Sequence, residues 1–159
     1  MSVINVGIAD LNVALPPNQL ATYALGSCVG ICLYDPDRKI AGLAHIMLPW
    51  SKEANNPSQN PYRYADTGIT ALLQKMCSKG ASTARLKAKI AGGAQMFATS
   101  SEVFNIGDRN VQAVKTVLGS YRIPIIAEQT GSNFGRTVFF HSDTGIMEIR
   151  SAIKPTVML

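Results

Sequence analysis

The sequence lacks the features that mark exported, membrane-inserted and disulfide-rich proteins. Its amino-terminal segment, MSVINVGIADLNVAL, has no basic start followed by a long apolar stretch, as a secretory signal would. No uncharged apolar run approaches the about 20 residues that are needed to cross a bilayer. The cysteines number three, and an odd number does not suggest a disulfide framework. We therefore expect a soluble cytoplasmic protein with no membrane insertion.

Motifs of several enzyme and nucleic-acid-binding classes are absent as well. There is no GxSxG elbow of a serine hydrolase, no P-loop, and no GxGxxG segment after a strand. The AGGA segment at 91–94 lacks the Lys-Ser/Thr pair of a phosphate-binding loop. The net charge is +5, but the basic residues are dispersed and no aromatic residues alternate with them. We expect no nucleic-acid partner, whereas the charge suits an acidic protein partner.

Residues that could bind a metal are also few. Cys28, Cys32 and His45 are soft ligands, but neither a paired CxxC motif nor a fourth ligand accompanies them. A metal site built on these side chains is therefore a minor alternative. We expect no metal and no other cofactor.

The pattern of the chain favours one mixed α/β (α+β) domain over residues 1–159, with central antiparallel or mixed sheets and two main helices. Alternating and apolar runs bounded by Gly, Pro and Asn predict the strands. These runs lie at 2–13, 19–25, 28–34, 39–48, 85–91, 123–128, 137–141 and 146–151. The Asn- and Pro-rich stretch 49–61 is expected to be a mobile surface loop.

The two helices are predicted from apolar residues at 3.6-residue spacing. The first begins near Asp66, its expected N-cap, and ends at Gly80. Cys77 lies on this helix and is expected to be a buried structural cysteine. The second helix begins near Asn105 and ends at Gly119. Their apolar stripes are Ile69, Leu72, Leu73 and Met76 in the first, and Val111, Val114, Val117 and Leu118 in the second.

A β-hairpin signature surrounds Cys28. The sequence DPDR at 35–38 supplies turn chemistry between two apolar runs. If these residues form the loop, Tyr34 pairs with Lys39, and the same register sets Cys28 opposite His45 on one face, with Cβ atoms about 5 Å apart. A histidine beside a thiol makes a weak nucleophile a strong one. A slip of one residue would turn one of the two side chains to the other face.

Each candidate also has an ordinary structural interpretation. Cys28 is either a nucleophile or a buried core cysteine, and the residues alone divide these about evenly. Gly26-Ser27 before it could let backbone N–H groups approach a substrate carbonyl. His45 lies in an apolar run, where a histidine is usually a satisfied core residue; burial would lower its pKa and suit it to accept a proton. His141, beside a turn, is expected at the surface.

Several segments resemble those of a known family: LGSCVGICLYDP, AHIMLP, YADTGI, KIAGGAQMF and NIGDRN. They occur in order between residues 20 and 150 and resemble the signature segments of CheD, the family of chemoreceptor glutamine deamidases. The resemblance implies a fold similar to that of the deamidating bacterial toxins. It also implies hydrolysis of specific glutamine side chains of methyl-accepting chemotaxis receptors to glutamate, with ammonia release and a cysteine thioester intermediate.

The same resemblance implies roles for three residues. Cys28 would be the nucleophile, His45 the base and acid, and Thr22 a third member that orients the imidazole. Thr22 rests on the resemblance alone, because the register pointed only to Cys28 and His45. The implied partners are the cytoplasmic domains of chemoreceptors, as protein substrate, and the phosphatase CheC. We expect a monomer.

Two other functions stay open beside a protein-glutamine glutaminase. One is a regulatory binding module whose main role is to bind and stimulate CheC. The other is a cysteine hydrolase of small amides, which would need a closed pocket rather than an open, shallow site. The chain departs from the family pattern in the loop between Pro49 and Tyr64 and at Gln129, Ser132 and Phe134. Both regions are expected at the surface, where they bear on receptor recognition.

Overall fold

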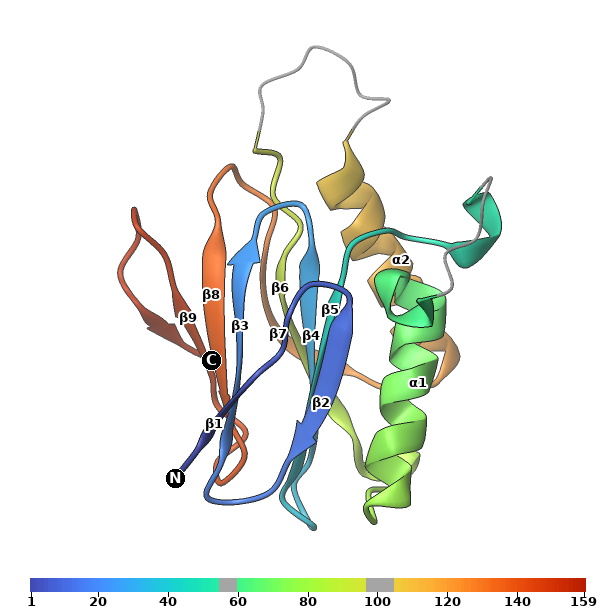
Figure 1. Ribbon diagram of the computed structural model, residues 1–159, viewed down its shortest axis with the longest axis vertical. Coiled ribbons are helices and arrows are strands. Elements are labelled where there is room, and N and C mark those ends of the chain that lie inside the picture. Colours follow the sequence, from blue (N-terminus) through green and yellow to red (C-terminus); the bar gives the residue numbers. More distant parts are fainter. Residues whose placement is uncertain (55–59, 97–104) are drawn as a thin grey trace.

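The computed structural model describes residues 1–54, 60–96 and 105–159. Over these ranges a pair of helices and a pair of β-sheets form three layers (Figure 1). The first sheet has the strand order β1-β3-β8-β9-β10 and the second has the order β2-β5-β4-β6-β7. Helices α1 (Ala65–Ser78) and α2 (Ile106–Ser120) cover the outer face of the second sheet (Figure 1). The second sheet is therefore the middle layer.

The bounds of the strands agree with most of the runs seen in the sequence. The first sheet consists of β1 (Val3–Asn5), β3 (Gln19–Leu25), β8 (Arg136–His141), β9 (Met147–Arg150) and β10 (Val157–Met158). The second consists of β2 (Asp10–Ala14), β5 (Ile40–Ile46), β4 (Val29–Asp35), β6 (Lys87–Gly92) and β7 (Ile125–Thr130). Short 3₁₀ helices are η1 (Ser51–Glu53), η2 (Pro61–Arg63) and η3 (Thr83–Arg85). The expected mixed α/β fold with two main helices is confirmed.

Alternation along the central strands divides the interior into two cores. Val29, Ile31 and Leu33 of β4 pack with the apolar stripes of α1 and α2. Cys32 of β4 and Leu43 of β5 lie in the other core, which the two sheets share. Every residue of β5 is buried, as expected for a strand that is covered on both faces.

The prediction of one strand over 2–13 is wrong. The segment forms β1 and β2, which belong to different sheets: β1 pairs with β3, and β2 pairs with β5. The chain turns between them at Ala9, whose φ is +56°. The alternation of apolar and polar residues over 2–13 therefore continues from a strand of one sheet into a strand of the other. Periodicity alone does not reveal where the chain changes sheet.

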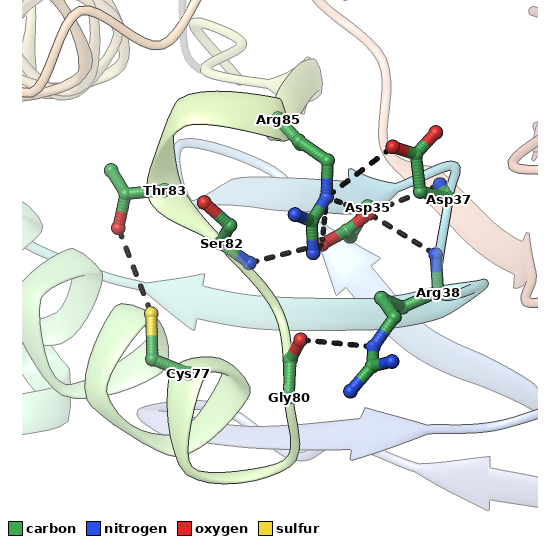
Figure 2. Close-up of polar contacts among 8 residues, drawn as sticks. All are labelled: Asp35, Asp37, Arg38, Cys77, Gly80, Ser82, Thr83 and Arg85. Atoms are coloured by element: carbon green, nitrogen blue, oxygen red, sulfur yellow. Dashed lines mark hydrogen bonds and ion pairs between the residues drawn. The ribbon is translucent and has the colours of Figure 1, made fainter.

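The predicted hairpin exists, but its register differs by two residues. Asp35 pairs with Ile40 as the last pair of the ladder, so Gly30, and not Cys28, lies opposite His45. The reason is the Asp35 side chain, whose Oδ1 accepts hydrogen bonds from the backbone N–H groups of Asp37 and Arg38 (Figure 2). Asp35 thus closes the turn with its carboxylate while its backbone stays in β4. A shift of two residues keeps the same faces, unlike a shift of one.

Two expectations for α1 are also wrong. Asp66 is not the N-cap: Tyr64 holds that position, and the Asp66 carboxylate accepts hydrogen bonds from the backbone N–H of Ser51 at 3.1 Å and from its hydroxyl at 2.7 Å. Asp66 therefore ties the chain after β5 to the first turn of the helix, where a negative charge is favourable. Cys77 is exposed, with its Sγ 3.6 Å from the hydroxyl of Thr83 (Figure 2). Its position beside the buried stripe does not bury it.

The Asn- and Pro-rich loop lies only partly within the described chain. Residues 55–59 fall outside it, and the flanking segments form η1 and η2. Asn60 caps η2 by accepting a hydrogen bond from the backbone N–H of Tyr62. None of the helices in the described ranges combines the length and apolar character that a membrane span requires.

Candidate active site

Two of the candidate residues, Thr22 and His45, are in contact across the two sheets. Thr22 comes from β3 of the first sheet and His45 from the end of β5 in the second. Cys28 lies in the connection from β3 to β4, at the end of the molecule where β6 ends and α2 begins (Figure 1). The site therefore lies where the core between the sheets reaches the surface.

Thr22 and His45 form a buried pair across the two sheets. The Thr22 hydroxyl is 2.7 Å from Nδ1 of His45 and also donates to the backbone oxygen of Val6 at 2.7 Å. A hydroxyl has a single hydrogen to donate, so Thr22 must accept the second hydrogen bond from an Nδ1–H group. The neutral imidazole is thereby fixed with its proton on Nδ1 and a lone pair on Nε2.

Nε2 of His45 is buried and has no hydrogen-bond partner within the described ranges. Burial lowers the pKa of His45 to about 4, so the ring is neutral at neutral pH. An orphaned buried acceptor is costly in a native protein and calls for an explanation. A base that awaits a proton from a neighbouring group is one such explanation.

Cys28 is partly buried and packs against the core that the two sheets share. Burial raises the pKa of its thiol, and the backbone N–H of Cys28 itself acts in the opposite direction. No hydrogen bond joins its sulfur to His45, because Nε2 has no partner among the described residues. The structure thus brings Thr22 and His45 into contact and places Cys28 close by in the fold, two residues before the Gly30 that lies opposite His45.

The segment that carries Cys28 is anchored through three consecutive carbonyl groups. The carbonyl of Gly26 accepts from the N–H of Ala94 at 2.8 Å, and that of Cys28 from the N–H of Gly93 at 2.8 Å. Between them, the carbonyl of Ser27 accepts from Nδ2 of Asn110 at 2.9 Å. In a trans peptide the N–H points opposite to the C=O, so the N–H groups of Ser27 and Cys28 face away from these anchors. Neither donates to an oxygen of the described residues.

Glycines at the end of β6 and in the first turn of α2 make this close packing possible. Gly92 has φ +111°, and a Cβ there would lie 2.2 Å from the Cys28 oxygen. At Gly107, in the first turn of α2, a Cβ would lie 2.5 Å from the oxygens of both Gly93 and Ala94. The segments Gly92–Ala94 and Asn105–Gly107 are therefore in contact, and the first of them is hydrogen-bonded to Cys28. Consecutive glycines at the end of a strand were the signal that could have revealed this from the sequence.

Two of the residues that depart from the family pattern, Gln129 and Phe134, contact Arg136, which in turn bonds to the end of β6. Gln129 accepts a hydrogen bond from Nε of the buried Arg136 at 2.8 Å, and the guanidinium lies 4.2 Å from the ring centre of Phe134. Arg136 also donates to the oxygen of Gly92 at 3.4 Å. Gln129 and Phe134 are partly exposed and Ser132 is exposed, and the first two also contact the buried guanidinium of Arg136.

Other candidate groups lie away from the site. His141 is not simply exposed: its side chain is 20% accessible and pairs with Glu148, with Nε2 3.1 Å from Oε1. Within the described ranges, no three His, Cys, Asp or Glu side chains are grouped so as to hold a metal ion. The cysteines Cys28, Cys32 and Cys77 are all free thiols.

The fold and this site define a mixed α/β protein with a candidate cysteine-hydrolase centre composed of a thiol, an imidazole and a hydroxyl. Residues 47–151 match the model of a family described as "CheD chemotactic sensory transduction". A "Probable chemoreceptor glutamine deamidase CheD" of Clostridium novyi is 57% identical, over 93% of this chain and 92% of the relative. The "Chemoreceptor glutamine deamidase CheD" of Halalkalibacterium halodurans is 49% identical, over 94% and 93%. The chain belongs to the CheD family.

A solved structure shares the fold without close sequence similarity. The Neisseria meningitidis protein NMB0706, assigned to the family DUF152, superposes with a TM-score of 0.52 at 10% sequence identity. The match covers 83% of this chain and 64% of that protein. This likeness concerns the arrangement of strands and helices alone.

Proposed function

We propose that this protein hydrolyses the side-chain amide of specific glutamines in chemotaxis receptors, giving glutamate and ammonia. The chemoreceptor glutamine deamidases among its relatives support this substrate. One observation carries the chemistry: the buried His45 keeps an unpaired Nε2 lone pair, fixed by Thr22, next to the segment that bears Cys28.

The reaction would begin from an uncharged pair. Burial raises the pKa of the Cys28 thiol and lowers that of His45 to about 4, so neither group is ionised at neutral pH. When the substrate amide approaches, the proton of the Cys28 thiol passes to Nε2 of His45. The sulfur then forms a bond to the amide carbon, and the carbonyl oxygen becomes an oxyanion. The N–H groups of Ser27 and Cys28, which donate to no oxygen of the described residues, are suited to stabilise this charge.

The second half of the reaction releases both products. The protonated His45 returns its proton to the amide nitrogen, the C–N bond breaks, and ammonia leaves a thioester on Cys28. Water then gives a proton to Nε2 and attacks the thioester carbon, and His45 passes that proton to the departing sulfur. Thr22 holds the imidazole but has no charge with which to stabilise an imidazolium, as a carboxylate would.

The test uses the purified chain and the cytoplasmic domain of a cognate receptor. Peptide mass spectrometry should find glutamine converted to glutamate with the intact protein and none with Cys28→Ala. Cys77→Ala is the matched control, since Cys77 is an exposed cysteine on α1, and it should retain the activity. Deamidation that persists in Cys28→Ala would eliminate this nucleophile. No conversion by the intact protein on any cognate receptor would remove the proposed function itself.

The family likeness also supports a complex with the phosphatase CheC, formed by a monomer in the cytoplasm. This role does not need the thiol, so Cys28→Ala should still co-purify with CheC and alter its phosphatase rate. Absence of both effects in the intact protein would exclude the regulatory role while leaving deamidation untouched.

A further inference from the structure

Asn110 is a fully buried polar residue on α2, and its side chain joins the two halves of the candidate site. Its Nδ2 donates to the Ser27 oxygen at 2.9 Å and to the Met47 oxygen at 2.9 Å. An amide nitrogen has two hydrogens, and both are used. Oδ1, the other polar atom of this side chain, is buried with no partner among the residues that the structure describes.

The bond to Ser27 sets the direction of a peptide group. The Ser27 carbonyl and the Cys28 N–H belong to one planar trans unit and point in opposite directions. A carbonyl held toward Asn110 therefore turns the Cys28 N–H away from α2. That N–H belongs to the residue that carries the attacking sulfur, so it is suited to donate to the carbonyl oxygen of an attacked amide.

The bond to Met47 acts on the base. Met47 follows β5 directly and is two residues beyond His45. Its backbone N–H donates to the Arg63 oxygen at 2.8 Å, so this end of the strand is held from two sides. The thiol lies just before β4 and the imidazole lies on β5, the strand that pairs with β4. Asn110 links the segments next to both side chains with one rigid amide group.

If position 110 served only to pack the core, an apolar residue would be expected there. Asn110 lies at helical spacing with Val114 and Val117, on the apolar face of α2, and asparagine is a weak helix former. A leucine would fill similar space but would leave the partly buried carbonyls of Ser27 and Met47 without this donor. An aspartate would place carboxylate oxygens against carbonyl oxygens. The position needs two donors and a short side chain, which asparagine provides.

We infer that Asn110 is a positioning residue for the deamidation proposed above, holding the Cys28 peptide and the His45 strand in the geometry that the reaction requires. It touches no substrate in this scheme. Its effect should fall on the chemical step rather than on the binding of the receptor.

The test compares Asn110→Ala with Val114→Ala, a truncation of another fully buried residue of α2, whose apolar side chain donates no hydrogen bond to Ser27 or Met47. Thermal unfolding first sets a temperature at which both variants are folded. There, Asn110→Ala should lower kcat by about 10- to 100-fold with KM within about twofold, as expected when a misplaced group loses transition-state interactions. Val114→Ala should keep kcat within about twofold of the parent. If Asn110→Ala does not fold, Asn110→Ser, which keeps one donor, takes its place.

Alkylation of Cys28 by iodoacetamide gives a readout that needs no receptor. Cys32 is buried, and a Cys77→Ala background removes the exposed thiol. Release of the Ser27 carbonyl should expose the sulfur to water and speed its alkylation severalfold in the Asn110 variant, but not in Val114→Ala. Equal kcat and equal alkylation rates in the Asn110 and Val114 variants would overturn the inference. Absence of deamidation by the parent would instead count against the proposed function, and the alkylation rates would still decide the role of Asn110.

Discussion

The Thr22 hydroxyl accepts a hydrogen bond from the Nδ1–H of His45 and is the only group that fixes the tautomer of this imidazole among the described residues. Thr22→Val keeps the shape of the side chain but leaves the Nδ1–H of His45 buried without an acceptor. Such a loss costs about 1–3 kcal/mol, so kcat/KM should fall about 5- to 150-fold. Steady-state deamidation of the receptor domain measures this.

Thr22→Ser is the matched control for that change, because it keeps the oxygen that accepts from Nδ1. It should remain within about threefold of the parent, since only a methyl group is lost. Nitrogen NMR of the imidazole should show the Nδ1–H form in the parent and in Thr22→Ser. A Thr22→Val variant with unchanged kcat/KM and an unchanged tautomer would contradict the role assigned to the hydroxyl.

At the scale of single elements, the turn between β4 and β5 is held by one buried carboxylate. Asp35 accepts hydrogen bonds from Ser82 N–H at 3.0 Å and from Nη2 of Arg85 at 2.8 Å, as well as from its own turn (Figure 2). Burial alone would raise the pKa of Asp35, but the Arg85 guanidinium and these N–H groups outweigh it and hold the pKa at about 2. The carboxylate thus ties the hairpin to η3.

We predict that Asp35→Ala lowers the free energy of unfolding by about 2–3 kcal/mol, because several buried donors lose their acceptor while the half-exposed Arg85 can be rehydrated. Urea denaturation measures the change. The control is Asp37→Ala, whose side chain is 72% exposed and 3.6 Å from Arg85, and it should cost less than about 0.5 kcal/mol. Since β4 has seven residues, this turn is about 20 Å from Cys28. Deamidation by the folded Asp35→Ala variant should therefore be unchanged, and a large loss would contradict this separation.

The same hairpin shows how far the sequence could lead and where it stopped. Turn chemistry and apolar runs predicted two paired strands, and the two-residue error preserved the face of His45. The error arose because the sequence around Asp35 is compatible with two positions for this residue, the first residue of the loop or the last residue of β4. Only its contacts with Ser82 and Arg85, far along the chain, distinguish the two.

For the whole molecule, periodicity located both helices and most strands, because burial of one face is a local property of the sequence. Contacts across the two sheets are not local. Thr22 of β3 contacts His45 of β5 because the two sheets pack against each other, and no spacing in the sequence encodes that packing. Asn110 did leave a signal, since it is a polar residue at helical spacing with Val114 and Val117 on an otherwise apolar face.

Burial of His45 also links the site to the stability of the molecule. Its pKa is about 4 in the folded protein against an ordinary value of 6.5. Between these values the unfolded chain binds the proton more tightly, so the free energy of unfolding should fall as pH decreases from 6.5 to 4. A difference of this size corresponds to roughly 3 kcal/mol over the window, and the contribution is fully present above pH 6.5.

We predict that His45→Gln flattens this pH dependence, because a glutamine has no proton to gain. Urea denaturation of the parent and the variant at intervals between pH 4 and pH 7 measures the slopes. His141→Gln is the control, since it removes the other histidine and leaves His45 in place, and it should keep the fall in stability. The acidic group with the most clearly depressed pKa, Asp35 at about 2, responds below this window. Equal slopes in the parent and in His45→Gln would mean that the imidazole is not held neutral by burial, and the uncharged starting pair would then have to be abandoned.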